Sequence, residues 1–267
     1  MALATQAGLP HRLAGFPHRA SNIEHRAAPA QAGLNSTPVS VILPIFNEEA
    51  SLPGAAREIL AVAPVFFADY ELILVNDGSD DRTASICGEL AAESPCVRAI
   101  HHSSNRGYGA ALRSGFAAAT KEWIFFMDAD RQFRFDDISG LLPHLERHDL
   151  IMGYRAPRHD PWFRILAARI GNFLARWMLG IRARDINCAF KLVRRDRLQA
   201  LDLRSEGGFI NAELLALAAA EGWRCVEAPV RHFPRRYGAA TGARPRVIGR
   251  ILWECLRLRR RILSKAR

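Results

Sequence analysis

Residues 123–133 read WIFFMDADRQF, five large apolar residues followed by two acids one residue apart, Asp128 and Asp130. A short apolar run without polar alternation predicts a strand buried on both faces, as in a parallel sheet. Three earlier runs of this kind are each followed by apolar residues at helical spacing. Strands are expected at 39–44, 71–75 and 97–101, and helices at 52–63, from Asp80 or Asp81 to 90, and at about 110–119. This alternation predicts an α/β fold, with a mostly parallel sheet and helices on both faces.

The second half of the chain continues the pattern less regularly. Strands are expected at 150–153, 188–193 and 224–228, helices at 162–179 and 210–220, and a last helix from Pro245. The first 38 residues lack a continuous apolar stretch and predict a disordered leader. We therefore expect a leader at 1–38, one main domain at 39–242 and a C-terminal helix at 243–267.

The positive charge of the chain is concentrated at its C-terminal end. Residues 231–267 hold 12 of the 37 Lys and Arg but one acid, Glu254, which gives this segment a net charge of +11. The remainder holds 25 basic and 26 acidic residues, a net charge of −1. A basic segment of this kind binds phosphates or anionic lipid, and it also raises the alternative of a nucleic-acid-binding protein.

Two further features concern the compartment. Arg, Asp or Glu interrupts every apolar run before it reaches the roughly 20 residues that a membrane-spanning helix needs. The five cysteines form no C-x-x-C pair and have no histidine at metal-ligand spacing. This usage favours a reducing, cytoplasmic compartment.

The acid pair after the apolar run at 123–127 predicts a cation site. In a parallel sheet, ligands bind beyond the carboxyl ends of the strands, where Asp128 and Asp130 are expected. Two carboxylates in one small volume repel each other unless they share a cation. Mg²⁺ or Mn²⁺ takes oxygen ligands and commonly joins carboxylates to substrate phosphates, although an isolated acid pair is more often merely solvated.

Four motifs, each after one of the first four strands, make the pair more than an isolated feature. They are Pro44-Ile-Phe-Asn-Glu48, Asn76-Asp-Gly-Ser-Asp-Asp-Arg-Thr83, Asn105-Arg-Gly-Tyr-Gly-Ala-Ala-Leu-Arg-Ser-Gly115 and Asp128-Ala-Asp-Arg-Gln132. In this order they resemble the family-2 glycosyltransferases, whose GT-A fold is a Rossmann-like α/β domain. Three later segments, Gly153–Arg155, Asp185–Lys191 and Glu227–Gly238, resemble the polyprenyl-phosphate sugar transferases of that family, the dolichol-phosphate mannose synthase type.

The resemblance implies an inverting, metal-dependent transfer of a hexose from UDP- or GDP-hexose to a polyprenyl phosphate of the dolichyl or undecaprenyl type. It implies a peripheral enzyme at the cytoplasmic face of the inner membrane. It also assigns residues to roles. Asp128, Asp130, Arg235 and Arg236 are expected in catalysis; Asp128, Asp130 and Gln132 around Mg²⁺ or Mn²⁺; Pro44, Asn47, Glu48, Asp77, Gly78, Gly107, Asp128 and Arg155 around the nucleotide sugar; and Asp185, Lys191 and Arg231 on the acceptor side.

The chain departs from the family pattern at three places. Phe46 stands where the family usually has Tyr, and Asn76 stands where it usually has the first acid of D-D-G-S, so we expect Asp77 to contact the base or ribose. The spacing after Arg235 in Arg-Arg-Tyr-Gly-Ala-Ala-Thr241 is also shifted. Two structural alternatives stay open: Gly107 and Gly109 can be turn residues, and Asp185 can form an ordinary ion pair with Lys191.

The acceptor can be argued from its chemistry. A phosphate with a second pKa of about 6 is largely ionised at neutral pH and needs no catalytic base, whereas a sugar hydroxyl does. No Glu-Asp dipeptide occurs in 150–230, where many sugar-polymerising relatives carry their base. This favours the phosphate over the alternative of a sugar or other hydroxyl acceptor.

The last helix is expected to be basic and amphipathic. Its apolar face would contain Ile248, Ile251, Cys255, Leu258 and Ile262, with Arg246, Arg250, Arg257, Arg260 and Arg261 opposite. Such a helix can lie in the headgroup plane of an anionic membrane, the reading we favour, or dock on the main domain. Trp253 is the one aromatic residue near these arginines, so we expect no nucleic-acid partner.

Overall fold

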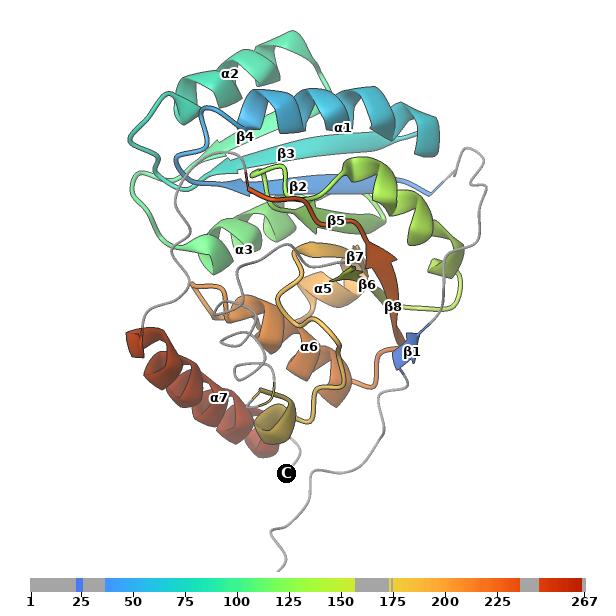
Figure 1. Cartoon of the computed structure of the whole chain (residues 1–267), viewed down its shortest axis with the longest axis vertical. Helices are drawn as coiled ribbons and strands as arrows, with labels where there is room; N and C mark the ends of the chain where they lie inside the picture. Colours follow the sequence, from blue (N-terminus) through green and yellow to red (C-terminus); the bar gives the residue numbers. More distant parts are fainter. Residues whose placement is uncertain (1–22, 26–36, 157–172, 174, 236–244, 266–267) are drawn as a thin grey trace, which may run out of the picture.

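The computed structural model describes residues 23–25, 37–156, 173, 175–235 and 245–265 (Figure 1). In the last helix, side chains are described for residues 252–264. Several expectations therefore fall outside the described residues: most of the leader at 1–38, Arg236, most of the helix expected at 162–179, of which residues 173 and 175–179 are described as helical, and the side chains of Arg246, Ile248, Arg250 and Ile251.

A single sheet of eight strands runs through the molecule in the order β1-β8-β6-β7-β5-β2-β3-β4. The strands are β1 Ile23–His25, β2 Val39–Ile45, β3 Tyr70–Asn76, β4 Val97–His101, β5 Trp123–Met127, β6 Leu150–Arg155, β7 Phe190–Arg194 and β8 Cys225–Val230. Within the described residues every pairing is parallel except those of β7, which is antiparallel to β5 and β6. The mostly parallel α/β fold expected from the sequence is confirmed, and the direction of β7 is new.

Helices cover both faces of this sheet, which explains why its central strands are apolar throughout (Figure 1). All residues of β2 and β5 are buried. One core cluster joins the sheet to α1 (Leu52–Phe66), α2 (Thr83–Glu93) and the 3₁₀ helix η1 (Phe135–Gly140). The other joins it to α3 (Tyr108–Ala118), α6 (Ile210–Ala220) and α7 (Pro245–Lys265).

Three short helical pieces were not expected from the sequence. They are η1, η2 (Leu142–His144) and α5 (Arg195–Gln199). Pieces of three to six residues complete at most two turns, so they carry too few residues for a 3.6-residue pattern to be recognised. The strand β1 was also unexpected; it pairs in parallel with β8 at the edge of the sheet and lies within the segment 1–38.

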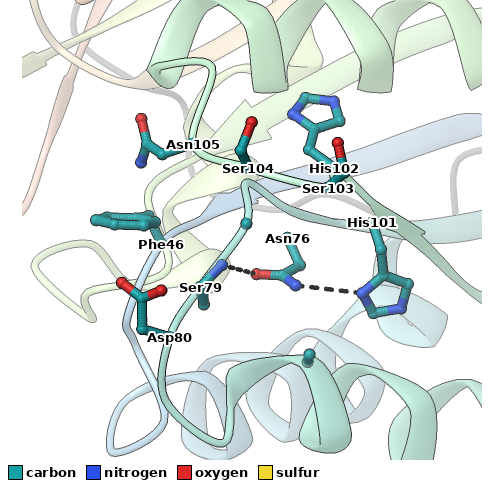
Figure 2. Close-up of a pocket in the computed structure, with 11 residues that line it drawn as sticks. Phe46, Asn76, Ser79, Asp80, His101, His102, Ser103, Ser104 and Asn105 are labelled. Carbon is teal, nitrogen blue, oxygen red and sulfur yellow. Dashed lines mark hydrogen bonds between the residues drawn. The ribbon is translucent and has the colours of Figure 1, made fainter.

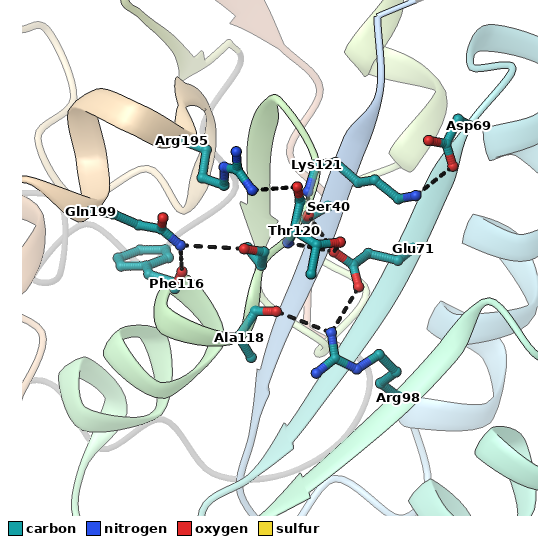
Figure 3. Close-up of polar contacts among 11 residues, drawn as sticks. Ser40, Asp69, Glu71, Arg98, Phe116, Ala118, Thr120, Lys121, Arg195 and Gln199 are labelled. Atoms are coloured by element: carbon teal, nitrogen blue, oxygen red, sulfur yellow. Dashed lines mark hydrogen bonds and ion pairs between the residues drawn. The ribbon is translucent and has the colours of Figure 1, made fainter.

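A buried carboxylate ties the strands together at the end of the sheet opposite the carboxyl ends of β2, β3 and β5 (Figure 3). Glu71 accepts hydrogen bonds from Ser40 Oγ (2.7 Å), from Thr120 N and Oγ1 (2.7 Å each) and from Arg98 Nη1 (3.0 Å). Burial by itself raises the pKa of Glu71, but these hydrogen bonds outweigh it and the pKa is lowered. These hydrogen bonds fix the beginnings of β2 and β3 relative to the segment that leads into β5.

The apolar face of α7 lies against the domain. Cys255, Leu258 and Ile262 are buried in the core cluster shared with α6, and Arg261 contacts the buried Glu213 of α6. The structure thus shows the docked arrangement for these three residues of the expected apolar face, whereas the side chains of Ile248 and Ile251 lie outside the described residues. No helix in the described part of the chain has the length and apolar character needed to cross a membrane.

Candidate active site

Asp128 and Asp130 lie directly beyond the carboxyl end of β5, as the sequence predicted. Asp130 is buried and Asp128 partly buried. Burial, together with the nearby charge of Asp130, raises the pKa of Asp128 to about 7, although Tyr108, Arg155 and Lys191 act in the opposite direction. The pair therefore resists carrying two negative charges, the condition that a bound cation relieves.

Three loops that are distant in sequence meet at Asp130. Arg235 contacts the carboxylate of Glu48 and lies 3.6 Å from Asp130, measured from Nη1 to Oδ2. Gln132 fixes the segment that carries Arg235. Its Nε2 donates to Phe233 O at 3.2 Å, and Phe233 N donates to Gln132 O at 2.8 Å. Burial raises the pKa of Glu48 despite its contacts with Ser51 and Arg235. The motifs at 44–48 and 128–132 and the described part of the third, 227–235, thus form one acidic centre closed by Arg235.

A buried lysine lies on the inner side of this centre. Lys191, on β7, has no exposed surface, and its Nζ donates to the carbonyls of Ile186 and Cys188 and to Asn211 Oδ1 at 2.8 Å. An ammonium group has three N–H donors, so all of them are used. Burial lowers the pKa of Lys191 to about 8. Lys191 therefore supports the 186–188 backbone and adds positive charge behind Asp128, and its place on the acceptor side stays a prediction.

Asp185 pairs with Arg155, and not with Lys191. Arg155 donates from Nε to Asp185 Oδ2 at 2.6 Å and from Nη2 to Oδ1 at 2.8 Å, a two-pronged contact between β6 and the chain that enters β7. Asp185 is buried, and Arg155 is close enough to Asp128 to lower its pKa. The ion pair thus fixes a positive charge beside the acid centre.

Two residues of the centre were not expected from the sequence, Tyr108 and Asn211. Tyr108 begins α3, and its buried hydroxyl lies beside Asp128 and Asn211, where it lowers the pKa of Asp128. Asn211 is buried in α6, where a polar residue inside an apolar helix was the signal available in the sequence. Tyr108 and Asn211 therefore add two polar groups to the inner side of the acid centre, next to Asp128 and Lys191.

The acid pair provides few protein ligands for a divalent cation. Among the described residues no three His, Cys, Asp or Glu side chains surround one point, so the chain offers the two carboxylates of Asp128 and Asp130. Mg²⁺ and Mn²⁺ are commonly held by one or two carboxylates, with substrate phosphates and water completing the shell. The residues present fit such a cation. The amide nitrogen of Gln132 is used by Phe233, and its side-chain oxygen is the group left to act as a ligand.

A pocket of about 520 Å³ opens beyond the carboxyl ends of β3 and β4 (Figure 2). Its walls are Phe46, Asn76, Gly78, Ser79, Asp80, Ala84 and residues 101–105. Gly78 has φ of 66°, and a Cβ there would come within 2.3 Å of the Ser104 backbone, so glycine is required where these two loops touch.

Asp77 is not part of the pocket wall. It is buried, and its carboxylate accepts hydrogen bonds from Arg106 N (3.0 Å) and Gly107 N (2.8 Å) and pairs with His102 Nδ1 (2.6 Å). His102 Nε2 lies 2.8 Å from Ser114 Oγ. In the structure its oxygens hold the loop that forms the pocket, and the expected contact of Asp77 with the base or ribose stays a prediction.

The remaining predicted residues have mainly local partners. Arg231 pairs with Asp136 and Asp137 of η1, both at 2.7 Å, and lies exposed. Gly107 has φ of 96°, and a Cβ there would meet Glu206 O at 2.5 Å, which favours the turn interpretation over contact with an anion. Pro44 is buried in β2, whereas the exposed Asn47 accepts a hydrogen bond from Asp80 N at 2.9 Å. Arg231 is thus turned to η1, and Asn47 links two loops at the edge of the site.

Comparison with known proteins adds independent information. The family model described as "Glycosyl transferase family 2" matches residues 40–201. The curated protein "Undecaprenyl-phosphate 4-deoxy-4-formamido-L-arabinose transferase" of Enterobacter sp. (strain 638) is 35% identical over 204 residues, 75% of this chain and 61% of that protein. The protein of the same name from Serratia proteamaculans (strain 568) is 34% identical over the same shares. The chain therefore spans about three fifths of the length of these relatives.

Solved structures share the fold. Glucosyl-3-phosphoglycerate synthase from Mycobacterium tuberculosis matches with a TM-score of 0.67 and 20% identity over 87% of this chain and 88% of that one. Mannosyl-3-phosphoglycerate synthase from Rubrobacter xylanophilus matches with a TM-score of 0.65 and 16% identity, over 86% and 75% of the two chains. One structure of the former contains Mn²⁺ and uridine diphosphate. At these identities the likeness supports the GT-A type of fold and nothing finer.

Proposed function

This chain belongs to glycosyl transferase family 2, and we propose that it transfers a hexose from a nucleotide-diphosphate sugar to a polyprenyl phosphate, with inversion, at the cytoplasmic face of a membrane. One observation carries the proposal. Asp128 and Asp130 lie beyond the end of β5, and Arg235 contacts both Asp130 and Glu48, the acid that follows β2. An acid pair that can hold a cation, with a guanidinium beside it, suits a diphosphate that leaves as negative charge develops on it.

The residues around the acid pair have separable roles in this proposal. Asp128 and Asp130, with the side-chain oxygen of Gln132, would hold Mg²⁺ or Mn²⁺, and the cation would stabilise the charge of the leaving diphosphate. Arg235 sits at the mouth of the site on the 231–235 segment, where its planar fork can pair with phosphate oxygens. Arg155 is oriented by Asp185 and places a fixed positive charge on the inner side.

A phosphate acceptor needs no catalytic base, unlike a sugar hydroxyl. An ionised phosphate oxygen attacks the anomeric carbon from the face opposite the leaving group, and no proton has to be removed. Among the described residues the candidate acids outside the acid centre are otherwise bound: Asp185 by Arg155, and Glu213 by the backbone amides of Arg204 and Ser205 and by Arg261. The names of the curated relatives, which are undecaprenyl-phosphate sugar transferases, support the same acceptor class.

Membrane contact is part of the proposal. We place it at the exposed aromatic residues of 173–177 and α7, because the described residues of α7 that were expected to enter the membrane are buried against the domain. Phe173 and Trp177 are 67% and 70% exposed, and Trp253 on α7 is 58% exposed, although residues 175–179 and α7 pack on the same core cluster. Arg176 lies beside Trp177 in the wall of a hollow of about 560 Å³. Exposed aromatic rings among arginines suit the interface of an anionic membrane.

The test supplies radiolabelled UDP- and GDP-hexoses with Mn²⁺ and undecaprenyl or dolichyl phosphate to the full chain. The expected product is a lipid-linked sugar that partitions into organic solvent. Absence of such a product with every common donor, in the presence of added lipid, would refute the lipid-phosphate acceptor. Products confined to the aqueous phase would instead indicate a sugar or other hydroxyl acceptor.

An Asp130→Ala variant separates the site from the fold in the same assay. We expect turnover to be lost while thermal unfolding stays cooperative, because Asp130 lies at a loop and not in a core cluster. Glu146→Gln, at an exposed position after η2, serves as the matched control for loss of one carboxylate. Retained turnover in Asp130→Ala would remove the cation role from this pair.

A further inference from the structure

The pocket beyond β3 and β4 contains an asparagine and a histidine whose hydrogen bonds fix each other (Figure 2). Ser79 N lies 3.1 Å from Asn76 Oδ1, and Asn76 Nδ2 lies 3.2 Å from His101 Nδ1. A backbone N–H can only donate, so the atom of the Asn76 amide that faces Ser79 must be its oxygen. The amide therefore presents its NH₂ group to His101.

This orientation determines the tautomer of His101. An NH₂ group donates and does not accept, so Nδ1 of His101 must offer its lone pair and carries no proton. In the neutral ring the proton then resides on Nε2. Among the described residues no hydrogen bond is made by Nε2, and His101 is an exposed residue of the pocket wall. His101 thus carries a neutral N–H donor, Nε2, at the pocket wall.

The position of the pocket relates it to the acid centre. In the sheet order β5-β2-β3-β4, Asp128 and Asp130 lie at the end of β5, and His101 ends β4, three strands away. With strands about 4.8 Å apart, the two ends are separated by about 14 Å along the sheet edge. Phe46, at the end of β2 between them, is 42% exposed and also lines the pocket. A nucleotide whose diphosphate lies at β5 would extend across β2 and place its base at β3 and β4.

We propose that Asn76 and His101 select a nucleobase that carries a ring carbonyl, which accepts a hydrogen bond from His101 Nε2–H while Phe46 packs against the ring. Uracil and guanine carry such a carbonyl, and adenine does not. The inference rests on the proposed function, because it assumes that a nucleotide binds here. It also gives a reason for Asn76: an acid at this position accepts hydrogen bonds and would draw the ring proton to Nδ1, leaving Nε2 of a neutral ring as an acceptor.

Binding measurements on the full chain test the proposal without turnover. The affinities of UDP, GDP and ADP are measured by calorimetry with Mn²⁺, for the wild type and for His101→Leu, His101→Gln and the control Glu146→Gln. One net hydrogen bond corresponds to roughly a 2- to 12-fold change in affinity. We expect His101→Leu to lose this factor for UDP or GDP and to leave ADP unchanged. His101→Gln, whose amide can donate, should recover part of it.

The tautomer itself is measured by ¹⁵N NMR of histidine-labelled protein. We expect the His101 signals of the Nε2–H form in the wild type, and a mixture of forms in Asn76→Ala. A wild-type ring protonated at Nδ1, or equal losses for all three nucleotides in a folded His101→Leu protein, would overturn the inference. Failure of every nucleoside diphosphate to bind the wild type would instead refute the proposed function.

Discussion

Cation binding by this protein should depend on pH in a range where ordinary carboxylates do not titrate. Burial and the charge of Asp130 raise the pKa of Asp128 to about 7, and a cation binds the ionised form. With this pKa, about 9% of Asp128 is ionised at pH 6 and about 91% at pH 8 in the absence of cation. The apparent affinity for Mn²⁺ should therefore weaken about tenfold between pH 8 and pH 6.

The assay is the free Mn²⁺ signal in electron paramagnetic resonance, titrated with protein from pH 6 to pH 8. Because histidines titrate in the same range, the Asp128 carboxyl is also followed by ¹³C NMR without cation. Asp130→Asn should move the Asp128 midpoint to lower pH, since it removes the neighbouring charge. An affinity for Mn²⁺ that is flat from pH 6 to pH 8, or a wild-type Asp128 midpoint near 4, would refute the reasoning.

Three further predictions concern the framework around the site. Lys191→Met leaves three buried acceptors without a donor, and because each costs about 1–3 kcal/mol, it should reduce the free energy of unfolding in urea titrations by about 3 kcal/mol or more. The control Lys121→Met, whose partner is half exposed, should cost less than about 1 kcal/mol. Glu213→Gln removes the charge that binds Arg261, so we expect faster hydrogen exchange of the amides of 252–264, with exchange of the sheet amides unchanged. If the variant and the wild type protect 252–264 equally, α7 is held by its apolar face alone. Gly107→Ala forces a Cβ to within 2.5 Å of a carbonyl oxygen at φ of 96°, so the melting temperature should fall, and an unchanged value would show that the loop relaxes freely.

The sequence predicted the part of the fold that local pattern determines. Trp123–Met127 has five buried apolar residues, so its place in the centre of a sheet followed from composition, and the acids beyond it followed from the chain leaving the sheet there. The direction of β7 did not follow, because a short apolar strand reads the same in parallel and antiparallel pairings. Its direction depends on the path of the chain from β6.

Residue roles were harder to predict than residue positions. Asp77 follows β3 where expected. Its oxygens, however, are hydrogen-bonded by the amides of residues 106 and 107 and by the ring of His102, which lie 25 to 30 residues later in the chain. Lys191 was recognised as part of a motif, yet its ammonium group turns inward to carbonyls that no side-chain pattern encodes. Motif matching locates a residue at the site, and tertiary hydrogen bonds decide which way it points.

The reversed direction of β7 affects how this scaffold can be altered. Parallel strands all leave the sheet at the site, whereas β7 enters it there, so the connection from Arg155 to Phe190 both begins and ends beside Asp128. The described part of this connection is not a free loop, because Met178, Leu179 and Ile186 are buried in the core cluster shared with α6. An exchange of this connection between relatives therefore has to keep these core contacts and the pair of Asp185 with Arg155, and the new segment then lies beside the acid pair.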